Sequence, residues 1–437
     1  MLHTCRINHA EVCHPFSFHV YSCVAAPKTP AAAAAVPAKK WLTLNGKEPG
    51  VVARGGFSGI FPESSVNAND LAISSSSPGL TLLCSLQMTK DGAGICLSDI
   101  RLDNATTIST IFPKGQKTYK VNGQNLKGWF ALDYLADTIF SNVSLVQNIF
   151  SRPSIFDGQL AIAAVEEVLE SKPPKFWLSV QNAAYLASKK GLGIVDAVKS
   201  ALTKSTLDKK VLIQSDDSSV LDSFKDVPQY TRVLSIDKEI GDAPKPTIEE
   251  IKKHADAVNI LRSSLVTISQ SFATGKTKVV EAMHKGNISV YVSVLRNEYL
   301  SITFDYFSDP TVELATFIAG NGVDGVITEF PATATRYLRS PCSDLYRELP
   351  FAILPAEAGT LISVAAKEAQ PPATPPNPPL DAKDVIDPPL PPVANLATKN
   401  ASGGAQPASS GTTATTANLR LSFMAILALG LLLCAAA

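Results

Sequence analysis

Between Trp41 and Leu349 the chain alternates short aliphatic runs with segments of helical periodicity, and this alternation constrains the fold more than any other feature. Eight runs have the character of buried strands: Val51–Arg54, Thr81–Met88, Phe176–Gln181, Val211–Gln214, Thr231–Ile236, Ala257–Leu261, Ser289–Leu295 and Gly325–Thr328. Strands that are apolar on both faces and separated by helices form parallel sheets, and about eight predict a closed (β/α)8 barrel. The doubly wound alternative needs a Gly-rich nucleotide turn, and no G-x-G-x-x-G follows a strand.

The helices are predicted from apolar residues that recur three and four positions apart. The clearest segments are Gln159–Glu170, Ile194–Thr203, Thr247–Ala255, Lys276–His284 and Val312–Ala319. Thr247 and Glu250 have the spacing of a capping box, in which each side chain bonds the other's backbone amide. We therefore expect a helix to begin at Thr247.

The composition changes at Gln370, where a Pro-rich segment without aromatic residues begins. Such a segment cannot bury enough apolar surface to order itself, so we expect residues 350–420 to form an extended, semi-rigid stalk and spacer. We expect the barrel itself to occupy residues 41–349.

The last 17 residues, 421–437, are apolar and follow clusters of small residues, "NASGG" and "ASSG". This layout is that of a glycosylphosphatidylinositol (GPI) attachment signal, whose tail is removed on maturation. We favour attachment at Ser410, with Ser402 or Gly403 as the runner-up. An ordinary tail anchor is the alternative.

An attachment signal requires entry into the secretory pathway, yet residues 1–40 lack a clean charged start and apolar core. Either the region from Phe16 to Ala26 is a poor signal or the true first exon is not represented, and we favour the second. We expect the protein on the outer face of the plasma membrane, in the apoplast. Four N-x-S/T sequons fit a secreted glycoprotein, at Asn104, Asn142, Asn287 and Asn400.

Charge and cysteine content limit the partners and the redox state. Basic and acidic residues number 39 each, so no net field attracts nucleic acid, and any phosphate recognition must be local.

Cys84 and Cys96 flank "TKDG" at a spacing that would place them nearly opposite each other on a hairpin. They are either a cross-strand disulfide or two small buried hydrophobic residues.

Functional side chains of a barrel follow the C-terminal ends of its strands. The candidates at these ends are Arg54, Glu63, Ser85, Asp99, Gln181, Asp216, Arg296 and Glu329. Arg54 can hold a phosphate through two parallel donors, and Gly55, Gly56 and Gly59 would let backbone amides approach it. Gly-rich turns after strands are common, so this pattern alone identifies no chemistry.

Three segments carry a family resemblance: "VVARGGFSGIFPESS", "SLQMTKDGAGICLSDIRL" and "VDGVITEFPATA". Together they resemble the glycerophosphodiester phosphodiesterase family, and more closely its plant branch of GPI-anchored glycerophosphodiesterase-like wall proteins. The resemblance covers about Trp41 to Cys342 and extends into "DVIDPPLPPVA". It implies a TIM barrel of the phosphatidylinositol-phosphodiesterase-like type and, for active members, release of glycerol 3-phosphate and an alcohol.

The resemblance also implies which catalytic groups are missing. Active members use two histidines as acid and base, and carboxylates that hold a divalent cation. The histidine positions fall on Ala53 and Ser98, whereas the metal positions fall on Leu83, Ser85 and Ser179. We therefore expect little or no hydrolysis and no cofactor, with calcium or magnesium needed only if the chain is active.

The histidine distribution agrees with this interpretation. Of six histidines, four precede the barrel, and His254 and His284 lie within predicted helices. The residues that remain for ligand binding are Arg54, Glu63, Asp99, Gln181, Arg296 and Glu329. Three hypotheses stay open: a non-catalytic surface protein that binds a glycerophosphodiester or a cell-wall polymer, a residual phosphodiesterase, and a purely structural glycoprotein.

The two halves of the chain resemble different repeats of the plant branch, whose members carry two barrels in tandem. The chain begins like the first repeat, with "ARGGFSGIFPESS", and from about "FWLSVQNAAYL" it resembles the second. We therefore expect a composite barrel, in which residues 141–170 pack against a half drawn from the other repeat.

Overall fold

A computed structural model describes residues 13–16, 20–23, 41–204 and 211–395. The predictions for Asn400, for Ser410 and its alternatives, and for the apolar tail lie outside these residues. Near the N-terminus, β1 (Cys13–Phe16) and β2 (Val20–Cys23) form a separate antiparallel pair. Within the described residues no helix is both long and apolar enough to cross a membrane.

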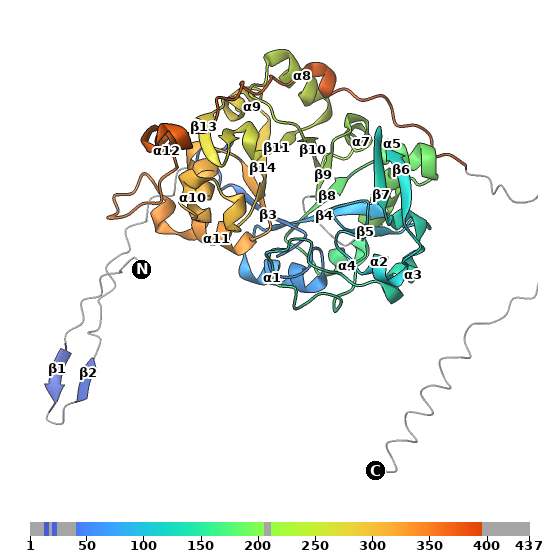
Figure 1. Cartoon of the computed structure of the whole chain (residues 1–437), viewed down its shortest axis with the longest axis horizontal. Helices are drawn as coiled ribbons and strands as arrows, with labels where there is room; N and C mark the ends of the chain where they lie inside the picture. The colour runs from blue at the N-terminus through green and yellow to red at the C-terminus, as the bar shows by residue number, and fades with distance from the viewer. Residues whose placement is uncertain (1–12, 17–19, 24–40, 205–210, 396–437) are drawn as a thin grey trace, which may run out of the picture. The chain divides into compact units, whose positions relative to one another are not determined.

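Eight parallel strands close into a barrel around which the helices are arranged (Figure 1). The order around the barrel is β3, β4, β8, β9, β10, β11, β14 and β15, and β15 pairs with β3 again. Their bounds are Gly50–Arg54, Thr81–Met88, Lys175–Val180, Val211–Ser215, Tyr230–Ile236, Ala257–Leu261, Ser289–Leu295 and Gly325–Thr328. The predicted (β/α)8 fold is confirmed.

The strands are buried on both faces because they separate two apolar layers. Inside the barrel, one cluster joins Val52, Leu83, Trp177, Leu212, Val233, Ala257 and Ile327, with Tyr291 packed against them. The rings of Trp177 and Tyr291 meet edge to face, with 4.9 Å between their centroids. The alternate side chains pack outward against the helices, which is why each strand is apolar throughout.

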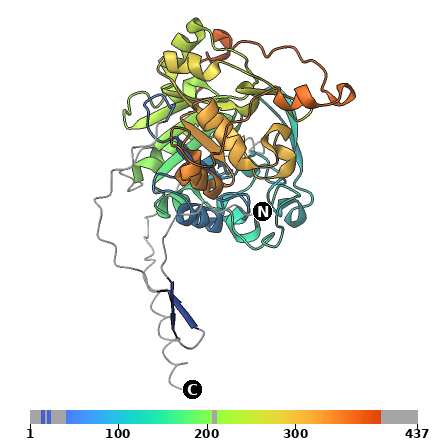
Figure 2. The same ribbon diagram turned by 90° about the vertical axis from the view of Figure 1, so that its left-hand side faces the viewer.

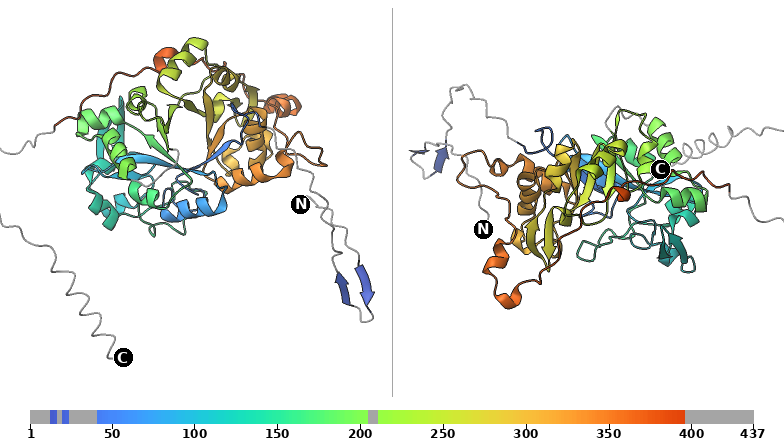
Figure 3. Two further views of the ribbon diagram at one scale, coloured as in Figure 1. Left: turned by 180° about the vertical axis from the view of Figure 1, so that it is seen from behind. Right: turned by 90° about the horizontal axis from the view of Figure 1, so that it is seen from above.

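At least one helix follows each barrel strand, and the helices cover the outside of the sheet (Figures 2 and 3). These helices are α1 (Val66–Ser75), α4 (Val165–Glu170), α6 (Ile194–Lys204), α7 (Ser218–Asp222), α8 (Lys245–His254), α9 (Val279–Lys285), α10 (Pro310–Ala315) and α11 (Pro331–Arg339). The π-helix η6 (Thr316–Gly320) continues α10, so the predicted helix at Val312–Ala319 is α-helical in its first part and π-helical in its second.

Two predicted helix starts are wrong because tertiary pairing competes with local periodicity. The region before Val165 is extended, and Ala164 forms a bridge with Ile95. Lys276 ends a strand, β13 (Phe272–Lys276), which pairs with β12 (Val266–Ser269).

The predicted capping box is also wrong. Helix α8 begins at Lys245, and Thr247 lies inside it, where its hydroxyl donates to the carbonyl oxygen of Leu380 at 2.9 Å. The side chain therefore binds a distant segment and does not cap its own helix.

Further strands extend the barrel on its C-terminal side. Strand β5 (Gly94–Cys96) pairs antiparallel with the end of β4, and a disulfide joins Cys84 to Cys96 with their Cα atoms 5.1 Å apart. In the ladder Cys96 faces Leu86, so the register is offset by two residues from the expected opposition. A second hairpin consists of β6 (Lys117–Val121) and β7 (Gln124–Gly128).

Residues 371–394, here called the C-terminal strap, pack along the barrel, which corrects the expectation of a stalk from residue 350. Leu380 and Val385 are buried in the main core. Backbone bonds fix the same segment, because Gly241 donates to Pro378 and Leu380 donates to Asp242. Buried aliphatic side chains and backbone bonds, together with the bonds of Asp387 to Ser218, thus hold this Pro-rich segment on the barrel.

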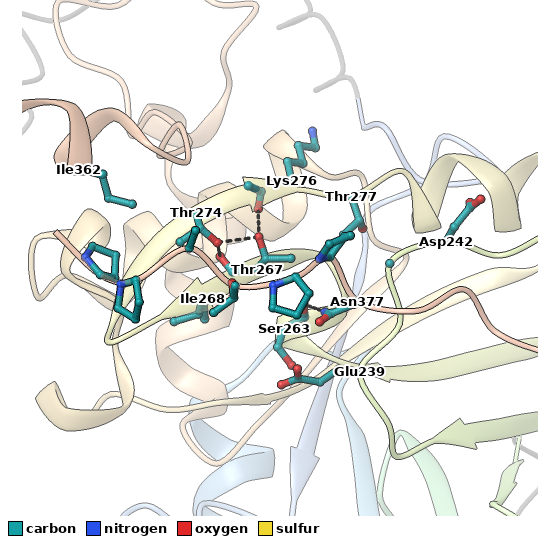
Figure 4. Close-up of a pocket in the computed structure, with 18 of the residues that line it drawn as sticks. Glu239, Asp242, Ser263, Thr267, Ile268, Thr274, Lys276, Thr277, Ile362 and Asn377 are labelled. Atoms are coloured by element: carbon teal, nitrogen blue, oxygen red, sulfur yellow. Dashed lines mark hydrogen bonds between the residues drawn. The ribbon is translucent and has the colours of Figure 1, made fainter.

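The strap crosses the β12–β13 hairpin and encloses a cavity of about 860 Å³ (Figure 4). Threonine hydroxyls line its hairpin side, where the Oγ1 atoms of Thr267 and Thr274 lie 2.8 Å apart. Proline rings line its strap side. Asn377 of the strap donates to the carbonyl oxygen of Ser263 at 3.2 Å.

We predict that Leu380→Ala lowers the free energy of unfolding by about 2–5 kcal/mol, because it removes a core side chain. Ile386→Ala is the matched control, since Ile386 is 53 % exposed and its truncation should change stability by less than about 0.5 kcal/mol. Urea denaturation of both variants measures the difference. Equal midpoints for the two would mean that the strap does not pack in solution.

Candidate functional site

Three arginines converge on one buried carboxylate at the C-terminal end of the barrel. Glu329 follows β15 and is 2 % exposed. Arg54, at the end of β3, donates to its Oε1 at 2.6 Å, and Arg296, after β14, donates to both oxygens at 2.7 and 3.1 Å. Arg152 reaches the same carboxylate from the loop after α3 (Ala136–Asn142).

The charges of this cluster set the pKa of its carboxylate. Burial raises the pKa of Glu329, but the hydrogen bond from Arg296 and the charges of Arg54, Arg152 and Arg296 outweigh it and lower the pKa to about 2. The same contact raises the pKa of Arg296. The Glu329 carboxylate is therefore ionised at neutral pH.

Arg152 and Glu298 belong to the site but carry no sequence signal. Arg152 Nε donates to Glu298 Oε1 at 2.5 Å, and the two residues are 146 positions apart. Arg152 also donates to the carbonyl oxygen of Ser58 at 3.0 Å. Neither residue lies in a motif or at the end of a strand, so only the fold brings them together.

The Gly-rich loop after β3 is shaped by its own backbone contacts. Gly56 has a φ of +70°, and a Cβ there would lie 2.5 Å from the backbone of Ala68. The amides of Gly55 and Gly59 bond the carbonyl oxygens of Leu83 and Glu329. The expectation that these glycine amides approach a phosphate is therefore wrong at Gly55 and Gly59, whose donors are already used.

Glu63 lies beside Ser98, one of the two positions to which the resemblance assigns a histidine. Its Oε1 accepts from the hydroxyl of Ser98 at 2.7 Å and from the Ser98 amide at 3.2 Å. The other histidine position, Ala53, is fully buried. A serine hydroxyl bound to a carboxylate and an alanine methyl offer no group that titrates near neutral pH.

The three positions to which the resemblance assigns metal ligands hold side chains without a carboxylate. Leu83 packs in the apolar cluster inside the barrel. Ser85 is buried, and Ser179 accepts from Gln214 at 3.4 Å within a neutral layer that also contains Ser235 and Asn259. Calcium and magnesium prefer carboxylate oxygens, and in the part of the chain that is described no three His, Cys, Asp or Glu side chains are grouped to hold a metal ion.

Asp99 and Gln181 do not join the arginine cluster. Arg101 and Asn104 both bond the Asp99 carboxylate, at 2.7 and 2.9 Å. Gln181 accepts from Gln87 at 3.4 Å, on a neighbouring strand of the barrel. Of the six predicted ligand-binding residues, the structure connects Arg54, Arg296 and Glu329 directly.

The two histidines of the barrel are structural. His284 bonds Asp324, which precedes β15 and so lies at the end of the barrel opposite the cluster. His254, in the last turn of α8, bonds Asp222 at 2.9 Å. Three of the sequon residues, Asn104, Asn142 and Asn287, are exposed, so they are accessible for glycosylation.

A comparison with known families decides the identity of the barrel. The Glycerophosphoryl diester phosphodiesterase family matches residues 56–333, which is more than half of the chain. This chain belongs to that family. The match begins in the Gly-rich loop, two residues after Arg54, and ends in α11, so it includes Arg152, Arg296 and Glu329 of the arginine cluster.

Plant members of the phosphodiesterase family are among the curated relatives that match this chain. Glycerophosphodiester phosphodiesterase GDPDL7 of Arabidopsis thaliana is 45 % identical over 683 residues, which cover 82 % of this chain and 91 % of the relative. GDPDL3 of the same plant is 37 % identical, over 74 % of this chain and 44 % of the relative. These identities place the chain in the plant GDPD-like group.

The alignment with GDPDL7 is longer than this chain of 437 residues. Long internal parts of the relative therefore have no counterpart here. Among solved structures, a phosphodiesterase of this family from Silicibacter pomeroyi is 14 % identical, with a TM-score of 0.49, and the match covers 68 % of this chain and 97 % of that one.

We predict that Glu329→Gln lowers the free energy of unfolding by about 3–5 kcal/mol at pH 7, because three arginines lose their shared partner. The folded pKa of about 2 lies below the ordinary value of 4.5. The stability contributed by the carboxylate is therefore fully present above pH 4.5 and is lost as the pH falls through about 2.

Urea midpoints at a series of pH values test this. The difference between wild type and Glu329→Gln should shrink from pH 4.5 downward, whereas the control Glu348→Gln, at an exposed position, should match wild type throughout. A gap that persisted unchanged at the lowest pH would contradict the depressed pKa.

Proposed function

We propose that the barrel mouth binds a phosphodiester through Arg54, Arg152 and Arg296 and does not hydrolyse it at an appreciable rate. The observation that carries this proposal is the convergence of three guanidinium groups at the end of the barrel where functional residues gather. Guanidinium groups bind phosphate oxygens through paired N–H donors.

Two of these arginines keep donors available for a ligand. The side chains of Arg54 and Arg296 are 25 % and 34 % exposed, and Arg54 uses only Nη1 on Glu329 among the described residues. Arg152 is buried and binds the Glu329 carboxylate from within the protein interior. We infer that Arg54 and Arg296 contact the ligand and that Arg152 positions Glu329.

The replaced residues support the absence of hydrolysis. Cleavage of a phosphodiester needs a group that accepts a proton and one that donates it to the leaving alkoxide. Ala53 cannot do either, and Ser98 is bound to Glu63. Loss of one such group costs about 10²- to 10⁴-fold, so loss of both should bring the rate close to that of the uncatalysed reaction.

A residual phosphodiesterase is the second candidate, and one carboxyl favours it. Asp216 follows β9 and is exposed at the mouth, yet the surrounding protein and Asp237 raise its pKa to about 6. A carboxyl with that pKa holds a proton in mildly acidic solution and could serve as an acid. It is three strands away from Arg54 in the barrel order.

We further propose that the protein is GPI-anchored at the plasma membrane and acts in cell-wall organisation. The apolar tail and the small residues before it support the anchor, and the sequons support secretion. We also propose that the barrel is a composite of two tandem repeats, which agrees with the unmatched internal parts of GDPDL7.

We predict that the secreted chain turns over glycerophosphocholine at less than about 1 per second with calcium or magnesium present, below the range of ordinary enzymes. The measurement is release of choline and glycerol 3-phosphate. Metal-dependent turnover above that rate that is lost in Arg54→Ala would contradict a non-catalytic mouth.

Binding is tested separately by thermal unfolding. Glycerophosphocholine at about ten times its Kd should raise the Tm by about 2 °C, because it binds only the folded chain. Arg54→Ala should remove this rise, and Arg336→Ala, an exposed arginine on α11, should keep it. No rise in the wild type at any concentration would favour the purely structural hypothesis.

A further inference from the structure

The C-terminal strap is held on the barrel by two contacts of different kinds. Its first part, residues 377–385, has the buried side chains of Leu380 and Val385 and several backbone bonds to the barrel. Its second part, residues 386–394, runs past α7 (Figure 1), and none of its side chains is fully buried. Apart from the partly buried Leu390, the second part therefore depends on polar bonds.

Asp387 supplies most of these polar bonds. Its Oδ2 accepts from the amide and the hydroxyl of Ser218 at 2.9 and 3.3 Å, and its amide donates to the same hydroxyl at 2.9 Å. At the end of the strap, the amide of Ala394 donates to the carbonyl oxygen of Ala187 in the π-helix η2 (Leu186–Lys190). One carboxylate thus fastens the second part to the start of α7.

Carboxylates of the barrel surround this contact. Asp216 and Asp217 directly precede Ser218 in the chain. Asp237 follows β10, which pairs in parallel with β9 and so ends at the same edge of the barrel. The strap therefore brings the carboxylate of Asp387 next to three others, and like charges at this distance repel each other.

No basic side chain among the described residues forms an ion pair with these four carboxylates. Lys238 pairs with Asp384 of the strap, and Lys383 pairs within the strap itself. In the last turn of α8, His254 bonds the residue at the far end of α7. In η2, Lys190 lies over an aromatic ring of the β6–β7 hairpin. The contact of Asp387 therefore carries negative charge without a basic partner.

The repulsion acts on the protonation of Asp216. Burial and the charges of Asp237, Asp217 and Asp387 raise the pKa of Asp216 to about 6. Undocking of the strap would remove the charge of Asp387 and part of the burial, so the pKa would fall toward 3.8. A carboxyl whose pKa is raised by docking favours docking in acid, and this contribution is lost as the pH rises through about 6.

We propose that the second part of the strap is a pH-sensitive latch, docked on α7 in mildly acidic solution and released near neutral pH. Protonation of Asp216 removes a negative charge that faces Asp387, and ionisation restores it. The first part stays docked at both pH values, because it is held by apolar side chains and neutral backbone bonds. The latch uses no residue of the arginine cluster, so it and the proposed function can fail independently.

Release of the latch would lengthen the connection between the barrel and the residues that follow the strap. Residues 386–394 would span up to about 28 Å when extended, at about 3.1 Å per residue. Under the membrane anchor that we propose, the barrel would therefore reach farther from the membrane at neutral pH than in acid.

Hydrogen exchange of the full chain at about pH 5 and about pH 7.5 tests the latch, with rates converted to protection factors to remove the intrinsic pH dependence. We expect the protection of the Asp387 amide to fall about fivefold between the two. A pKa change of about one unit on docking would give this effect, because solvent screens the partly exposed Asp216. The Leu380 amide, which bonds Asp242, is the internal reference and should keep its protection.

Variants assign the effect to the carboxylates. Asp216→Asn preserves the size of the side chain but cannot ionise, so protection should stay at the acid level at both pH values. Asp387→Asn keeps an oxygen that can accept from Ser218, and it should also remove the pH dependence. Asp226→Asn is the matched control, since Asp226 is exposed in the loop after α7, and it should show the full fivefold fall.

Two results would overturn the latch. One is equal protection of the wild-type Asp387 amide at the two pH values. The other is a fivefold fall that persists in both Asp216→Asn and Asp387→Asn, which would assign the pH dependence to another group. The Leu380 amide shows in each variant that the chain is folded, so a variant that fails to fold is recognised and the second one decides.

Discussion

The carboxylate of Glu329 holds the mouth of this barrel together. It follows β15 and binds arginines from β3, from the loop after β14 and from the loop after α3. A carboxylate is costly to bury alone, and so are three guanidinium groups, so each of these groups is stable there only because the others are present. The cluster therefore fixes two loops whose sequences contain no motif of their own.

Electrostatic pairing at the mouth and apolar packing in the barrel have different roles. The lower layer of the interior, with Trp177 and Tyr291, is apolar and supplies stability. Above it lies a neutral layer in which Gln214 bonds Ser179 and Ser235. The charged cluster lies at the mouth, where Arg54 and Arg296 are partly exposed, so the interior becomes less polar with depth and a charged ligand would stay at the mouth.

The sequence predicts the barrel strands well and the segments that pack around them poorly, for physical reasons. Each of the eight strands was predicted within one or two residues, because a strand buried on both faces is apolar along its whole length. The region before Val165 and the residue Lys276 were placed in helices, but they pair with distant strands. Local periodicity cannot report such contacts.

The strap and the site show the same limit. Composition correctly indicates that a Pro-rich segment cannot fold alone, yet Leu380 and Val385 find a place in a core formed by other residues. Arg54, Arg296 and Glu329 were predicted because they end strands, whereas Arg152 reaches the site from a loop. Convergence of loops far apart in the chain is a property of the fold and not of any sequence window.

The charges at the mouth bear on our proposal that this protein binds a phosphodiester without hydrolysing it. Arg54, Arg152 and Arg296 lie beside the carboxylates of Glu329 and Glu298, and Glu63 also acts on Arg296, so the exposed guanidinium donors and not a surplus of positive charge would hold a phosphodiester. A guanidinium group neutralises phosphate but cannot give up its proton near pH 7. Under the function we propose, with the histidine positions on Ala53 and Ser98 as the resemblance implies, the mouth would attract a phosphodiester but have no histidine to protonate its leaving group.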